Sequence, residues 1–78
     1  MAAIEEFRTL TPEALDALER AVRERRRVAL RRGGTEFVVV AERLDTGPRD
    51  ELLEGRLPMT GEILTFRLRE LETFAVLP

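Results

Sequence analysis

The chain has 78 residues, of which 44 % are hydrophobic and 36 % charged, a balance that suits one small folded domain rather than a disordered tail. All 13 cationic residues are arginine, 15 acidic residues bring the net charge to −2, and Lys, His, Cys, Ser, Tyr, Trp, Asn and Gln are absent. This inventory excludes nucleophiles paired with histidine, lysine Schiff bases, disulfides and the usual zinc or copper sites. We therefore expect a protein that is not an enzyme and that needs no cofactor or metal.

The first clear element is an amphipathic helix over about residues 12–26. Thr11 is a good N-cap residue, and Pro12 suits the first helical position because its missing N–H would have no partner there. The apolar side chains that follow recur at helical spacing and form one stripe, made of Leu15, Leu18 and Val22. Before the cap, residues 4–10 show no clean period and predict a short strand or an irregular lead-in.

After the helix the apolar pattern becomes alternating, which predicts five strands. Their expected ranges are about 28–32, 35–44, 51–57, 62–69 and 73–77. Gly33 and Gly34 form a hairpin turn between the first two strands, and Gly55 marks a bend or bulge in the third. Residues 37–41 are apolar on both faces of the second strand, which is expected to be covered on both sides or paired with another subunit.

One helix followed by five strands, with a tight turn before the last strand, predicts an α+β fold. The expected architecture is an N-terminal amphipathic helix followed by a five-stranded antiparallel small barrel of the SH3-like or Sm-like type. Closing the sheet into a barrel would remove its exposed edges. An open antiparallel sheet with the helix on one face is the competing fold. With either sheet, residues 1–78 are expected to form a single small domain.

Two segments resemble the WYL domain, a family of regulatory domains. Residues 25–32 are similar to the basic helix end and first strand of that domain, and residues 65–71 are similar to its late Phe-Arg-Leu-Asp-Arg-Ile stretch. The likeness spans roughly residues 14–77, and the naming Trp-Tyr-Leu triplet falls on residues 51–53, where Leu53 matches. The resemblance implies an SH3-like or Sm-like barrel in a transcriptional regulator that senses nucleic acid or small ligands.

Positive charge is concentrated in residues 20–32, which contain seven arginines and one glutamate. The segments on either side carry a net negative charge. Arginine forks match phosphate oxygens, so this cluster is a candidate nucleic-acid site. Its residues are Arg20, Arg23, Arg27, Arg31 and Arg32, the first three on one side of the expected helix. The competing interpretation, which we favour, is structural: the cations complement the helix dipole and pair with nearby acids.

Carboxylate chemistry is the one catalytic class that the composition leaves open. Glu51, Glu54 and Glu62 could gather around a divalent cation. Solvated strand positions are the simpler interpretation of these three residues. We therefore assign no catalytic residue and no metal ligand.

The expected partner is a second copy of this chain or another protein, because so small a domain buries only about 60 % of its unfolded surface. The candidate interface on the apolar strand is Phe37, Val39 and Val40. RNA or DNA at the arginine cluster is the alternative partner. No membrane-spanning run and no secretory pattern occur, so a cytoplasmic location is expected. The Arg- and Glu-rich composition is typical of a thermophile or of a GC-rich genome.

Overall fold

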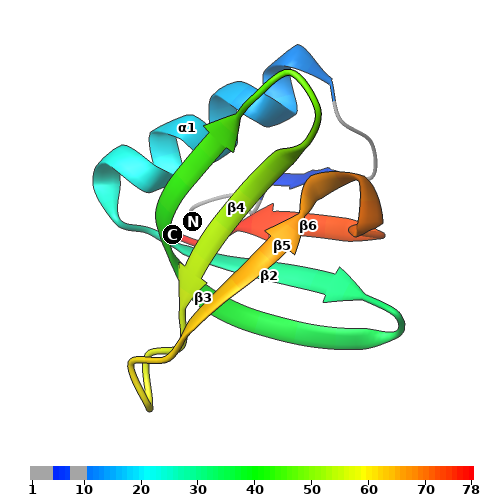
Figure 1. Cartoon of the computed structure of the whole chain (residues 1–78). Helices are drawn as coiled ribbons and strands as arrows, with labels where there is room; N and C mark the ends of the chain where they lie inside the picture. Colours follow the sequence, from blue (N-terminus) through cyan, green and yellow to red (C-terminus); the bar gives the residue numbers. More distant parts are fainter. Residues whose placement is uncertain (1–4, 8–10) are drawn as a thin grey trace.

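The computed structural model describes residues 5–7 and 11–78, and these form one α-helix, one 3₁₀ helix and six strands (Figure 1). In chain order the elements are β1 (Glu5–Phe7), α1 (Pro12–Glu24), β2 (Arg27–Arg32), β3 (Thr35–Thr46), β4 (Glu51–Arg56), β5 (Ile63–Arg67), the 3₁₀ helix η1 (Leu68–Glu70) and β6 (Thr73–Val76). All strands belong to one sheet in the order β1-β6-β2-β3-β4-β5, and every neighbouring pair is antiparallel. The predicted α+β class is confirmed, and β1 adds a short strand to the five expected from the alternating pattern.

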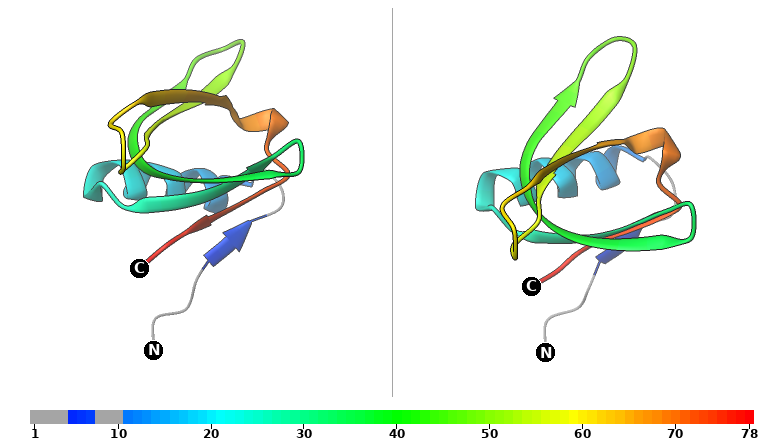
Figure 2. Two further views of the ribbon diagram at one scale, coloured as in Figure 1. Left: turned by 90° about the horizontal axis from the view of Figure 1, so that it is seen from below. Right: turned by 60° about the horizontal axis from the view of Figure 1, so that its bottom comes forward.

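The sheet is strongly curved but does not close into a barrel. Its edges are β1 and β5, and no pairing between described residues joins them. Figure 2 shows how β3 curves from the part of the sheet that contains β2 to the part that contains β4 and β5. The expected closure is therefore not found, and both edges of the antiparallel sheet remain open within the described chain.

The bend in β3 is explained by a bulge and by a close approach between strands. The register between β3 and β4 shifts between Ala41 and Arg43, which leaves Glu42 as the extra residue. Gly55 lies opposite Ala41, and a Cβ built on it would be 2.3 Å from Val39 Cγ2. The irregularity predicted at Gly55 thus belongs to β3, and the glycine itself makes room for the Val39 side chain.

The helix begins at the predicted residue and ends two residues earlier than predicted. The Thr11 hydroxyl accepts a hydrogen bond from the Ala14 N–H at 3.2 Å, as expected of an N-cap. At the other end Arg25 adopts a left-handed conformation with φ 52°. The Arg25 N–H donates to the Val22 carbonyl and the Arg26 N–H to the Ala21 carbonyl, which is a Schellman motif. The chain then turns into β2, so Arg27 lies on a strand and not on the helix.

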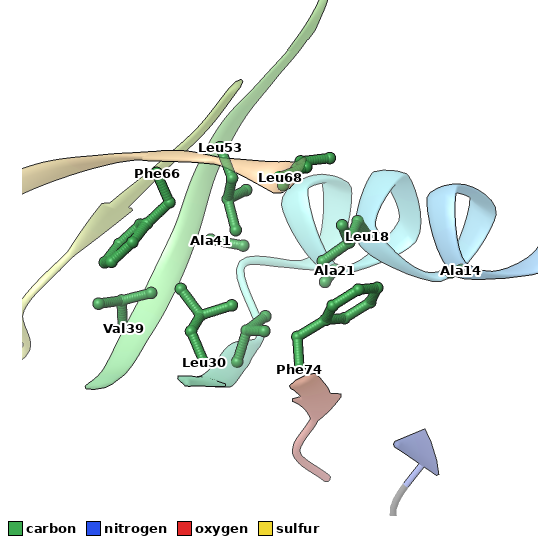
Figure 3. Packing of buried hydrophobic residues seen from close by; sticks show 11 residues of the cluster. Ala14, Leu18, Ala21, Leu30, Val39, Ala41, Leu53, Phe66, Leu68 and Phe74 are labelled. Carbon is green, nitrogen blue, oxygen red and sulfur yellow. The ribbon is translucent and has the colours of Figure 1, made fainter. Parts of the chain in front are cut away.

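The hydrophobic core lies between α1 and the concave face of the sheet (Figure 3). Figure 3 shows Leu18 and Ala21 of α1 facing Phe74 of β6, with Phe66 of β5 above Val39 of β3. The largest fully buried side chains are Phe66, Leu18, Leu30, Leu53, Leu68, Val28 and Val39. No polar or charged side chain is buried among the residues that the structure describes. Within the same residues, no helix is both long and apolar enough to cross a membrane.

Candidate functional surfaces

The five candidate arginines lie on three different faces. Arg20 and Arg23 are exposed on the side of α1 that faces away from the core. Arg27 and Arg31 are exposed on the outer face of β2, because the alternating residues Val28 and Leu30 point into the core. The early end of the helix therefore separates Arg27 from the first pair, and the predicted helical side that all three would share does not form.

Arg32 takes part in the packing of the core rim. Its guanidinium carbon lies 4.9 Å from the centre of the Phe66 ring and 5.4 Å from that of Phe37. The two rings meet edge to face at 5.3 Å. A cation over aromatic faces is attracted by the ring quadrupole, and the half-buried Arg32 side chain also covers both rings. This geometry gives Arg32 a structural role.

Glu42, the bulge residue, gathers two further arginines. Its carboxylate accepts from Arg25 at the helix end and from Arg56 Nε on β4, the latter at 2.5 Å. The Arg25 guanidinium also donates to the Glu42 carbonyl at 3.0 Å. The hydrogen bond from Arg56, together with the charges of both guanidinium groups, lowers the pKa of Glu42 although partial burial opposes the shift. These contacts fasten the helix end to the bend of the sheet. Arg25 and Arg56 are not among the five candidate arginines.

The predicted interface on β3 is divided between the two faces of the strand. Val39 is fully buried, and Phe37 packs inward against Phe66. Val40 is half-buried on the outer face, and its neighbour Val38 is 39 % exposed there. An uninterrupted apolar run carries no signal of which alternate residues face outward, so sequence reasoning selected Val39 and missed Val38.

The outer face around Val38 is not covered by the helix. In register across the sheet, Val38 lies opposite Ala29 of β2, and Ala29 lies opposite Ala75 of β6. These short side chains form an apolar row between the exposed Arg27 and Arg31 of the same face. The outer face of β2 and β3 is therefore a mixed surface with an apolar centre.

The β4–β5 hairpin carries the other exposed apolar side chains. Met59 in its turn is 95 % exposed, and Ile63 at the start of β5 is 50 % exposed. Together with Val38 they are the exposed large hydrophobic residues of the described chain. A methionine in the turn formed by residues 58–61 is the sequence signal that could have identified this exposed apolar position.

The acidic residues that the structure describes do not assemble into a cation site. Among the described residues, no group of three carboxylates is placed to hold a metal ion, and this includes Glu51, Glu54 and Glu62. A shallow cavity of about 130 Å³ lies beside the loop after β3, where Arg49 and Arg69 are balanced by Asp50 and Glu51. With equal numbers of opposite charges, its lining has no preference for either sign of ligand.

Comparison with known proteins identifies no relative of this chain. No family model, no curated protein and no solved structure matches it.

Proposed function

We propose that this chain is a non-catalytic binding module that acts by associating with protein, in the first place with a second copy of itself. The observation that carries the proposal is the position of the exposed apolar side chains. Val38, Met59 and Ile63 all lie on the sheet or on its β4–β5 turn, away from the helix. Exposed apolar side chains that share one surface mark association sites, and Met59 and Ile63 share the β4–β5 hairpin.

The proposal includes a curved sheet related to the small barrels, without closure into a barrel. The bend of β3 at Glu42, the order of the last five strands and the 3₁₀ helix before β6 support an SH3-like or Sm-like sheet that remains open. Membership of the WYL family is a further part of the proposal, supported by the similarity of residues 25–32 and 65–71. The cytoplasmic location expected from the sequence stays a prediction.

Sedimentation equilibrium over a series of protein concentrations tests the association. We expect a reversible increase in mass with concentration, and we expect it to persist at high salt because screening acts on charges and not on apolar contacts. A chain that stays monomeric up to millimolar concentration would contradict the proposal.

Nucleic-acid binding remains the alternative, and one observation favours it. Arg27 and Arg31 are both exposed on the same face of β2, about 13 Å apart along the strand. Fluorescence anisotropy with single-stranded RNA and DNA at low salt is the test. Binding that weakens steeply with salt and is lost in Arg27→Glu and Arg31→Glu, but kept in Arg20→Glu, would support this alternative.

A further inference from the structure

We propose that the free edge of β5 is where two copies of this chain pair, antiparallel to each other about a two-fold axis at Thr65. This inference rests on the proposed function, since it assigns the self-association to one surface and one register. It depends on the direction of the main-chain groups of β5, on the length of the two sheet edges and on the charges that the pairing brings together.

The main-chain groups of alternate β5 residues point away from β4. The Leu57 N–H donates to the Glu62 carbonyl at 2.8 Å, and these residues lie opposite each other when the β4–β5 register is extended into the turn. Hydrogen-bonded and non-hydrogen-bonded pairs alternate in an antiparallel ladder. The N–H and carbonyl groups of β5 that face the free edge are therefore those of Ile63, Thr65 and Arg67.

Of the two sheet edges, β5 is the one suited to pairing. The β1 edge is three residues long, and very short edges resist association. The β5 edge is five residues long, contains no proline, and begins with the half-exposed Ile63. Unpaired main-chain groups recognise another extended strand, so the chemistry of this edge selects a strand as its occupant.

A second copy of β5 fits this edge without opposing like charges. With the axis at Thr65, Ile63 of each copy lies opposite Arg67 of the other, and the two Thr65 residues face each other. The three residue pairs would form about six main-chain hydrogen bonds. The methylene groups of Arg67 would cover the exposed Ile63, and facing threonines are a favourable cross-strand pair.

Other registers of the same strand are less favourable. An axis at Arg67 would place two guanidinium groups directly opposite each other and would extend the pairing into η1, which is not a strand. An axis at Ile63 would extend the pairing into the turn at Gly61, where φ is +79°. An axis at Leu64 would pair Ile63 with Thr65, and an axis at Phe66 would pair Thr65 with Arg67, so each would form two hydrogen-bonded residue pairs instead of three and about four main-chain hydrogen bonds instead of six. Charge and the number of main-chain hydrogen bonds thus select Thr65.

A charge exchange tests the register directly. The Ile63→Arg variant places an arginine opposite Arg67 in both halves of the dimer, and we expect association to weaken about tenfold or more. Adding Arg67→Glu to the same chain converts both repulsive pairs into attractive ones, so the double variant should dimerise again. Both substitutions lie at exposed positions, and sedimentation equilibrium gives the dissociation constants.

A second variant tests the main-chain contact. Thr65→Pro removes an N–H that faces the free edge and makes no bond to β4, so the fold should persist while the dimer is lost. Circular dichroism and urea unfolding check that this variant folds, and if it does not, the charge exchange decides alone. Thr35→Arg is the matched control, because it adds an arginine at an exposed strand residue away from β5 and should leave the dimer intact. Val38→Glu tests the other exposed apolar side chain of the sheet, which the β5 pairing does not use.

The outcomes separate this inference from the proposed function. Association that ignores both β5 substitutions but is lost in Val38→Glu would overturn the β5 inference and keep the self-association. A wild-type chain that stays monomeric throughout would contradict both. Loss of the dimer in Ile63→Arg, recovery in the double variant and an unaffected Val38→Glu would establish the register.

Discussion

The missing side chain of Gly55 permits the close contact between β4 and β3. A Cβ at this position would lie 2.3 Å from Val39 Cγ2 and 2.7 Å from Val39 Cβ, well inside van der Waals contact. Val39 is fully buried, so it has no free direction in which to move. The absence of a Cβ atom at Gly55 therefore allows β4 to pack closely against Val39 beside the bend of the sheet.

Replacing this glycine should destabilise the fold. We expect Gly55→Ala to lower the free energy of unfolding by about 1–3 kcal/mol, the usual cost of overpacking a core. Urea unfolding at neutral pH measures it. Gly47→Ala is the control, because a Cβ there would meet its nearest atom, Asp45 Oδ1, at an ordinary 3.6 Å. Combining Gly55→Ala with Val39→Ala should cost less than the sum of the two single changes; additive costs would refute the contact.

The carboxylate of Glu42 should make stability depend on pH. A carboxyl group whose pKa is lower in the folded chain stabilises the fold above its unfolded pKa and loses this contribution as pH falls through the folded value. Wild type should therefore be more stable than Glu42→Gln at neutral pH, and the gap should close as pH falls below the ordinary value of 4.5. Urea midpoints of both chains at several pH values give the comparison. A gap that stays constant down to strongly acidic pH would rule out the ion pairs as its cause, and Glu36→Gln provides an exposed control.

At the scale of elements, the end of α1 determines where the arginine-rich segment goes. An arginine occupies the left-handed position that glycine usually takes, and its guanidinium binds Glu42 on β3. Arginine is a good helix former, so local propensity favours a helix that continues through Arg26. The stop comes from the local Schellman hydrogen bonds and from the contact of Arg25 with Glu42, which lies 17 residues further along the chain.

The position of the helix end predicts that glycine and alanine substitutions have opposite orders of stability at Arg25 and at Arg23. Arg25→Gly and Arg25→Ala both lose the ion pair, but only glycine relieves the left-handed backbone, so Arg25→Gly should be more stable by about 1 kcal/mol. At Arg23, inside the helix, the order should reverse, because glycine costs up to about 1 kcal/mol relative to alanine there. Thermal or urea unfolding of the four variants measures both differences. The same order at both positions would contradict the helix end at Glu24.

At the scale of the whole molecule, the core and the edge of the sheet contribute unequally to stability. Phe66 on β5 is fully buried, its ring meets that of Phe37 edge to face, and Figure 3 shows it above Val39. Phe7 on the three-residue edge strand is half-buried and contacts one ring, that of Phe74, at 5.3 Å. The apolar surface removed from water is larger at Phe66, so the free energy that depends on it is larger too.

This difference can be measured with a pair of substitutions. Phe66→Ala should cost about 3–5 kcal/mol of unfolding free energy, and Phe7→Ala clearly less. If Phe66→Ala does not fold, Phe66→Leu and Phe7→Leu replace the pair, and the change at Phe66 should remain the more destabilising one. Equal losses at both positions would show that the β1 edge belongs to the core.

The periodic elements of this fold could be predicted from the sequence, because one helical stripe and the alternating segments are local patterns. The closure of the sheet could not, since it depends on how far β3 bends at Glu42, a residue with no distinctive local signal. The faces of residues 37–41 could not be assigned either, because every side chain there is apolar and only the register separates Val38 from Val39. Ile63 could not be identified as a candidate contact from the sequence, because its importance depends on β5 being an edge strand of the sheet.

The order of the strands in the sheet also predicts the order in which the strand pairings form during folding. β2, β3, β4 and β5 are neighbours both in the chain and in the sheet, so each of these pairings closes only a short loop. β6 returns to β2, and β1 joins β6 from the opposite end of the described chain, so both close long loops at a larger entropic cost. We therefore expect the four-stranded meander to form early and the β1–β6 pairing to form last. By the same reasoning, β1 should be the first strand to open in the native state, while the meander protects its amides longest from exchange.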